Sequence, residues 1–203
     1  MPEKQSADPA ALAEVLAAGI LAHVAVVQDD QPFVVPVGYA PWREGIVFHG
    51  STASRLFKSL AAGTPTCATI TLLDGLVLAR SAFESSMEYR SAMLLGTCTP
   101  VTGPDKTHAL DTLTNHLLPG RAAHARSASA QEQKATTLIY LPATEWSVKI
   151  GAGFAEDSPE DLTDYAELWA GRVRMRTVFD EPEADPAAEE LPIPDYVRQW
   201  QHR

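Results

Sequence analysis

The stretch Ile46-Val-Phe-His-Gly-Ser-Thr-Ala-Ser-Arg-Leu-Phe-Lys-Ser-Leu60 predicts a strand that ends near His49 and turns directly into a helix. Hydroxyl side chains at Ser51 and Ser54 are placed to cap the free amide groups of a helix start. The apolar face of this helix has members at helical spacing, namely Leu56, Phe57 and Leu60. We expect the rest of the fold to be organised around this corner.

The corner is also a candidate phosphate site. A helix start carries unpaired N–H donors and partial positive charge, and both attract a phosphate group. Arg55 in the first turn, with Lys58 behind it, would add full positive charge. A strand–turn–helix with polar caps is equally ordinary architecture, and the glycine-rich phosphate signatures are absent. From these residues alone a phosphate site and a purely structural corner both stay open.

Composition sets the class of protein. With 203 residues, 45% hydrophobic and 21% charged, the chain is typical of one soluble globular domain. The net charge of −10 argues against a general nucleic-acid binder, which needs a basic face. We see no membrane-spanning apolar run and no signal peptide, so the cytoplasm is the expected compartment. Cys67 and Cys98 are expected to be buried, reduced thiols.

The remaining pattern predicts a mainly β protein with flanking helices, of the α+β class. Helices are expected at 9–18 and 103–118, the first capped by Asp8, and a turn is expected at Asp74-Gly75. A meander of antiparallel strands connected by short turns favours closure into a small barrel. Strands are expected over 20–27, 33–39, 46–49, 66–73, 76–83, 89–101, 136–141 and 145–150. We expect one barrel domain over 1–178. The acidic, proline-containing extension 179–203 is expected either to cover a partner subunit or to stay disordered.

A second polar stretch, Ser85 to Ser91, interrupts the strand pattern. Its Arg90 is flanked by the hydroxyl groups of Ser86, Tyr89 and Ser91, a set that suits an anion or a phosphorylated ring. The alternative is that Arg90 simply pairs with Glu88 or another carboxylate.

The order of these motifs resembles the pyridoxamine-phosphate-oxidase-like family, in the branch that includes nitroimidazole-resistance reductases. The resemblance covers roughly Leu12 to Gly171. It rests on Val47-Phe-His49-Gly50, Ser54-Arg55, Asp74-Gly-Leu-Val-Leu-Ala-Arg80, Ser86-Met-Glu-Tyr-Arg-Ser91, Pro119-Gly-Arg121 and Trp169-Ala-Gly171.

The resemblance implies a split β-barrel that binds FMN between the two subunits of a homodimer. It places the FMN phosphate at the strand-to-helix turn and brings Arg90 and Ser91 to the flavin from the partner subunit. Thr69 would bond to the polar edge of the ring. The cofactor positions it implies are His49, Gly50, Ser51, Ser54, Arg55, Thr69, Ser86, Tyr89, Arg90 and Ser91.

Some residues depart from the family pattern. Leu56 stands where the true oxidases carry a basic residue, and Glu88 stands where this branch more often has Asn. A carboxylate beside the cofactor disfavours a reduced, anionic flavin. The residues that bind the substrate phosphate in the true oxidases have no convincing match. Pyridoxal-phosphate synthesis is therefore not the expected activity.

We expect an oxidoreductase that acts on a small organic substrate through bound flavin, with a nicotinamide nucleotide as the expected reductant. The cofactor carries the redox chemistry, so no side chain needs to be strictly catalytic. The first alternative is a related split barrel that binds deazaflavin F420 or haem, with His49 or another histidine as the axial ligand. The second is a flavin carrier or sensor without turnover. No bare-metal site is expected, because His108, His116 and His124 lack the i, i+4 pair of a zinc helix.

Overall fold

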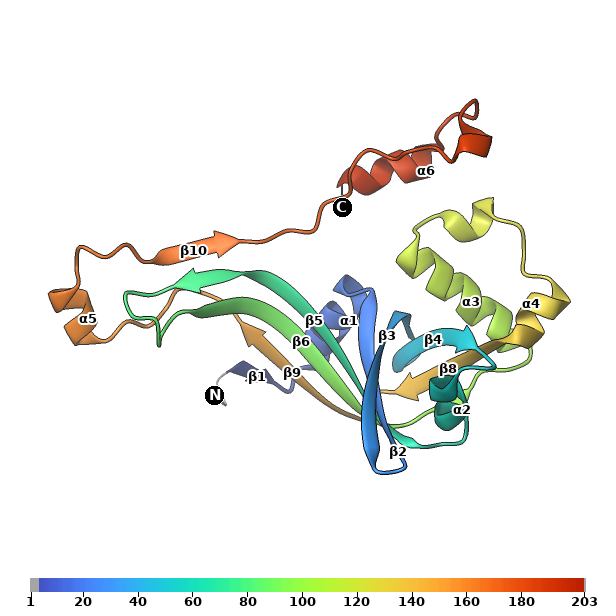
Figure 1. Cartoon of the computed structure of the whole chain (residues 1–203), viewed down its shortest axis with the longest axis horizontal. Helices are drawn as coiled ribbons and strands as arrows, with labels where there is room; N and C mark the ends of the chain where they lie inside the picture. Colours follow the sequence, from blue (N-terminus) through green and yellow to red (C-terminus); the bar gives the residue numbers. More distant parts are fainter. Residues whose placement is uncertain (1–3, 203) are drawn as a thin grey trace.

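A computed structural model describes residues 4–202, which form an open antiparallel sheet with helices on its flanks (Figure 1). The strands are β1 (Gln5–Ser6), β2 (Leu21–Gln28), β3 (Gln31–Trp42), β4 (Gly45–Ser51), β5 (Pro65–Leu78), β6 (Ser86–Thr97), β7 (Thr99–Pro100), β8 (Thr136–Pro142), β9 (Glu145–Gly151) and β10 (Gly171–Arg174). The α-helices are α1 (Pro9–Ala18), α2 (Arg55–Ala61), α3 (Pro104–Leu117), α4 (Ala130–Ala135), α5 (Pro159–Asp164) and α6 (Asp195–Arg198). Short 3₁₀ turns are η2 (Arg121–His124), η3 (Pro186–Ala188) and η4 (Gln199–His202).

The strand order is β1-β9-β6-β5-β2-β3-β4-β8-β7, with β10 added to the far end of β5. Each pairing among the described residues is antiparallel. The sheet curls without closing, which is the architecture of a split barrel. The predicted α+β class and split β-barrel are confirmed.

Local sequence signals explain most boundaries. Asp8 caps α1 by accepting a hydrogen bond from the Ala10 amide at 2.9 Å, and Pro9 takes the first helical position. The hairpin between β2 and β3 turns at Asp29 and Asp30, both with positive φ (52° and 58°), as a tight twisted hairpin requires.

The turn predicted at Asp74-Gly75 is wrong. β5 runs through these residues as one strand, and the pairing with β6 shifts register between Leu73 and Gly75. Glycine is required here for another reason. A Cβ on Gly75 would lie 2.8 Å from the Val173 carbonyl oxygen and 2.9 Å from Glu88 Oε2. The glycine therefore marks the close approach of β10 and not a turn.

Two apolar layers fill the fold. The larger lies inside the curled sheet, where α1 and α2 pack against the inward-facing residues of β2 to β6. The smaller lies between α3 and the opposite face of β3, β4 and β8, with Val47, Ala109, Leu113 and Leu138 among its buried residues. β4 thus has apolar layers on both faces, which explains why Ile46, Val47 and Phe48 are all buried.

The C-terminal part of the chain spans the length of the molecule. Figure 1 shows it leaving α5 beside the long β5–β6 hairpin, pairing as β10, and running back toward the end of α3. There the Trp200 indole donates a hydrogen bond to the Pro119 carbonyl at 3.1 Å, and Tyr196 stacks on His124. The extension therefore packs on its own chain. The domain boundary at residue 178 stays a prediction.

Candidate cofactor site at the β4–α2 corner

The predicted strand–turn–helix is present, with β4 ending at Ser51 and α2 beginning at Arg55. The Ser51 hydroxyl accepts a hydrogen bond from the Ala53 amide at 3.1 Å, as the sequence suggests. Ser54 is the residue before the helix, yet its side chain makes no capping bond. Arg55 is exposed and its guanidinium lies over the Phe33 ring, 4.3 Å from the ring centre. The corner therefore presents an uncapped helix start and an accessible cation.

The alternation of β4 separates two residues that the sequence grouped together. His49 follows Val47 on the face that meets α3, where Val47 belongs to the smaller apolar layer. Gly50 faces the other way, and a Cβ there would lie 2.2 Å from the Phe57 ring. His49 and Gly50 thus lie on opposite faces of β4 and cannot both line one face of a flat ring from this chain.

A cavity of about 480 Å³ lies on the His49 side of β4. It continues the smaller apolar layer outward and is covered by α3, η2 and the segment that leads into α4. Its lining residues are His49, Thr107, Leu110, Asp111, Thr114, Ala122, Ala125, Arg126, Ser127, Ala128, Glu132, Gln133 and Thr136. The volume falls within the range of roughly 300–1,000 Å³ typical of small-molecule sites.

The His49 ring has no hydrogen-bond partner among the described residues. Within residues 4–200 it makes no hydrogen bond, whereas His116 bonds the Gly19 carbonyl at 2.7 Å and His124 bonds the Gly120 carbonyl at 2.9 Å. Surrounding protein atoms lower the pKa of His49 below 6.5 because they disfavour the charged ring. His49 is therefore neutral at pH 7, with a nitrogen lone pair available to a ligand.

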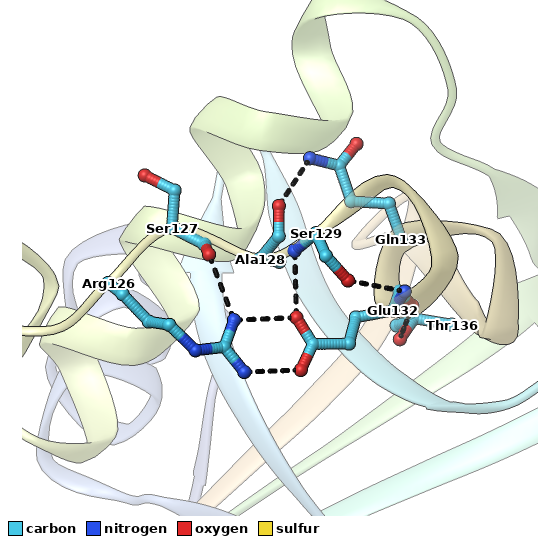
Figure 2. A network of polar contacts seen from close by, with 7 residues as sticks. All are labelled: Arg126, Ser127, Ala128, Ser129, Glu132, Gln133 and Thr136. Carbon is cyan, nitrogen blue, oxygen red and sulfur yellow. Dashed lines mark hydrogen bonds and ion pairs between the residues drawn. The ribbon is translucent and has the colours of Figure 1, made fainter.

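The polar network at the mouth of this cavity was missed at the sequence level (Figure 2). Arg126 holds the Glu132 carboxylate with two bonds of 2.8 and 2.6 Å, and Glu132 forms a capping box with Ser129 at the start of α4. The Ser129-Ala-Gln-Glu132 pattern is the signal that could have located this helix start. The pairing with Arg126 has no sequence signature, because it depends on how the loop folds back.

The second predicted group lies elsewhere on the sheet. Ser86, Tyr89, Arg90 and Ser91 are on β6, and Thr69 is on the adjacent β5. β2 and β3 lie between β5 and β4 in the strand order, and no hydrogen bond or ion pair between described residues links this group to the β4–α2 corner. Thr69 lies on a partly exposed face of β5. The Tyr89 ring packs on Gly151, where a Cβ would lie 3.0 Å away, as a residue of the barrel wall does.

The arginine side chains near β6, Arg90 and Arg172, form ion pairs with carboxylates of the same chain. Arg90 pairs with Asp74 through two bonds and with Glu14 at 3.2 Å, so the alternative of a carboxylate partner is confirmed, although Glu88 is not that partner. Glu88 is buried and bonds Arg172 of β10 and the Gly153 amide. Hydrogen bonds from Gly153 and Arg172 lower the pKa of Glu88. Glu88 thus holds the C-terminal arm to the barrel.

Three further observations limit the chemistry. Among the described residues, no group of three or more His, Cys, Asp or Glu side chains could hold a metal ion. Cys67 and Cys98 are free thiols, and burial raises the pKa of Cys98 to about 12. Within residues 4–202 no helix is long and apolar enough to cross a membrane.

An open antiparallel barrel, with a strand–turn–helix corner and a cavity beside it, defines the split-barrel class of cofactor-binding proteins. Residues 8–150 match the family model described as pyridoxamine 5'-phosphate oxidase. The chain belongs to this family. A search of curated proteins finds no match.

Solved structures extend the match to nearly the whole chain. The FAD and heme binding protein from Mycobacterium smegmatis is 38% identical over 98% of this chain and 97% of that one, with a TM-score of 0.93. The flavocytochrome Anf3 from Azotobacter vinelandii is 34% identical over 98% and 92%, with a TM-score of 0.89. A proposed 5-nitroimidazole antibiotic resistance protein from Bacteroides thetaiotaomicron is 19% identical over 72% and 86%, with a TM-score of 0.61, and shares the fold.

Proposed function

We propose that this protein is a flavin-dependent oxidoreductase that acts on a small organic substrate, with a nicotinamide nucleotide as reductant. The observation that carries the proposal is the similarity over almost the whole length to a protein described as binding FAD and heme. A bound flavin supplies hydride and electron transfer. The protein's side chains bind and orient the flavin and exclude water from it.

The β4–α2 corner is the proposed site of the flavin phosphate. The start of α2 lacks a side-chain cap, and Arg55 is exposed beside it. An anion there would accept hydrogen bonds from the free amides and pair with the guanidinium. Arg55 would have to leave the Phe33 ring, and an exposed cation–π contact of this kind is worth only about 0.5–1 kcal/mol.

A homodimer would bring the two predicted groups together. The outward face of β2 and β3 exposes Leu21, Val27 and Val34, about half of each side chain. Contiguous exposed apolar residues of this kind mark interaction surfaces. Thr69 lies beside them on β5. A second copy covering this face would add the β6 residues Ser86, Tyr89, Arg90 and Ser91 to the corner.

The first experiment is the visible spectrum of the purified chain after addition of flavin and desalting. We expect the protein to retain a flavin spectrum after desalting and a nicotinamide nucleotide to bleach that spectrum. Arg55→Ala should lower the affinity for flavin about tenfold. Arg43→Ala is the control, because Arg43 is an exposed arginine that stacks on an aromatic ring, Trp42, away from the corner. Chromatography of the released cofactor tells FMN, the expectation from the sequence, from FAD. Retained flavin that no nicotinamide nucleotide reduces would instead support a carrier or sensor.

Sedimentation tests the dimer. Val34→Glu buries a charge in the proposed interface and should give a monomer. Val178→Glu places the same charge at an exposed valine of the C-terminal arm and should leave the association unchanged. A Val34→Glu protein that sediments like the parent would show that this face is not the interface.

We propose a second cofactor, haem, in the His49 cavity. The specific observation is the neutral His49 ring, which makes no hydrogen bond, in a cavity of about 480 Å³ where the described residues do not supply the further ligands that a bare metal ion needs. A porphyrin supplies four nitrogen atoms itself, so one histidine is enough. Haemin added to the chain should give a histidine-ligated spectrum. His49→Ala should lose this spectrum and regain it with added imidazole, whereas His108→Ala, on the exposed side of α3, should not change it.

A further inference from the structure

Arg126 is the one basic side chain, other than His49, among the residues that line the cavity. The acidic groups there are Asp111 and Glu132. Lys106 lies nearby, but its ammonium group is committed to the carbonyl oxygens of Gln133 and Thr136, at 2.6 and 2.7 Å. Among the residues that line the cavity, Arg126 is therefore the one accessible cation, and its side chain is 74% exposed.

The segment that carries Arg126 is held at both ends. On the α3 side, the Ala122 amide bonds the Asn115 side chain at 3.1 Å, and His124 stacks on Tyr196. On the α4 side, Lys106 fixes the end of the helix to α3. Between these anchors residues 125–128 are exposed and outside regular structure, and Arg126 forms a two-bond ion pair with Glu132 (Figure 2).

Glu132 has a second partner besides Arg126. Its carboxylate also accepts the Ser129 amide at 2.7 Å, and its own amide donates to the Ser129 hydroxyl at 3.2 Å. The hydrogen bonds from Arg126 and Ser129 lower the pKa of Glu132 to about 2, so the carboxylate stays charged across the physiological range. If Arg126 separates from Glu132, neither charge is left buried without a partner, because the side chains of both residues are exposed to water. A solvent-exposed pair of this kind contributes little to stability.

We propose that the Arg126–Glu132 pair is an exchangeable latch, and that Arg126 leaves Glu132 to pair with a carboxylate of the ligand bound in the cavity. The ligand class is a flat, apolar molecule with a peripheral carboxylate, and a haem propionate fits it. The inference rests on the proposed binding of haem beside His49. Glu132 competes for Arg126, so it sets how readily the ligand enters, and segment 125–128 closes over the ligand once the exchange is made.

The probes are haemin and its dimethyl ester, which has the same ring but lacks both negative carboxylates. Each is titrated into the full-length, haem-free protein and followed by its absorption spectrum. We expect the parent protein to bind haemin about tenfold more tightly than the ester. Arg126→Gln should bind haemin about tenfold more weakly and the ester unchanged, because the lost contact exists only when the ligand carries a carboxylate.

Glu132→Gln is the complementary variant. Glutamine retains the capping box with Ser129 and removes only the competing charge, so haemin should bind several-fold more tightly. Arg43→Gln is the matched control, because it breaks another exposed arginine–carboxylate pair, the 2.6 Å contact with Asp105, and should change neither titration.

The outcomes separate the two proposals. If Arg126→Gln weakens haemin and the ester equally, Arg126 is only structural and the latch is wrong, although haem binding stands. If neither porphyrin binds, both the haem proposal and the latch are wrong. If FMN displaces haemin when the two are present at equal concentrations, the cavity holds a flavin and the inference is wrong.

Discussion

Arg90 grips the carboxylate of Asp74 across the β5–β6 pair, with Nε 2.9 Å from Oδ2 and Nη2 2.8 Å from Oδ1. This two-point geometry is the strong form of an ion pair. It means that Arg90 reaches a cofactor only by releasing Asp74, or through bonds that the pair leaves free. The structure thus places a competing carboxylate beside Arg90, one of the residues proposed to contact the cofactor.

Replacing Asp74 with Asn should lower the free energy of unfolding by about 1 kcal/mol, because the pair is partly exposed to solvent. The hydrogen bond from Arg90 lowers the pKa of Asp74 below its ordinary 3.8. The stabilisation is therefore present above pH 3.8 and lost as the pH falls through the lower, folded value. Urea unfolding at pH 7 and near pH 3 measures both effects. Asp180→Asn on the exposed arm is the control, and equal losses in the two variants would contradict the assignment.

The buried Glu88 should control how firmly β10 is attached. Glu88→Gln removes the charge that pairs with Arg172 and accepts the Gly153 amide. We expect faster hydrogen exchange over Gly171–Arg174, where β10 pairs with β5, and little change in α1 at the other side of the barrel. Glu181→Gln, an exposed carboxylate of the same arm, is the matched control. Unchanged exchange in β10 would mean that the strand pairing holds it without this contact.

Gly120 and Gly63 form a natural pair of variants. Both have left-handed backbone angles, φ +84° and +80°, so an alanine at either position costs about 1–2 kcal/mol of strain. A Cβ at Gly120 would also lie 3.0 Å from Tyr196 Cδ2, whereas a Cβ at Gly63 meets nothing within 4 Å. Gly120→Ala should therefore destabilise the protein more than Gly63→Ala.

Tyr196→Ala provides the test of that difference. In the Tyr196→Ala protein, Gly120→Ala and Gly63→Ala should lower the stability by equal amounts, because the side chain next to Gly120 has been removed. Thermal unfolding of the four proteins gives the comparison. An excess cost at Gly120 that persists without Tyr196 would show that the C-terminal segment is not its cause.

The lowered pKa of His49 should appear as a pH dependence of stability. The unfolded chain takes up the proton near pH 6.5, before the folded chain does. The free energy of unfolding should therefore fall as the pH drops below 6.5 and level off once the folded ring is also protonated. A histidine-resolved NMR titration locates the folded value directly. His49→Gln should remove this part of the pH dependence, and an unchanged profile would assign it to another group.

Much of the fold could be predicted because it is encoded locally. The Asp8 cap, the strand–turn–helix at 46–60 and the two separate strands β8 and β9 all form from neighbours in the sequence, and each lies where it was expected. The resemblance to the family added the split barrel, which no single segment specifies. The turn predicted at Asp74-Gly75 was wrong because the prediction used only local sequence. A glycine in a strand pattern can mark either a turn or the close approach of another strand, and the sequence does not distinguish the two.

The candidate site could be predicted only in part. Residue types indicated that His49, Arg55 and Arg90 are chemically capable, and the helix start was correctly located. Their availability was decided by contacts between distant segments. Arg90 is taken by Asp74, sixteen residues away, and Arg55 by the ring of Phe33. The cavity beside His49 exists only because α3 and the α4 segment cover that face of β4.

The sequence by itself indicated most of the strands and helices and the reactive side chains, because these follow from short-range periodicity and capping. The resemblance of its motifs indicated the family. Tertiary structure alone decided that α3 covers the His49 face of β4, that Glu88 anchors β10, and that Arg126 lines a cavity. These facts depend on strand register and on loops folding back. Register and loop path are set by the packing of the whole molecule, which no window of sequence contains.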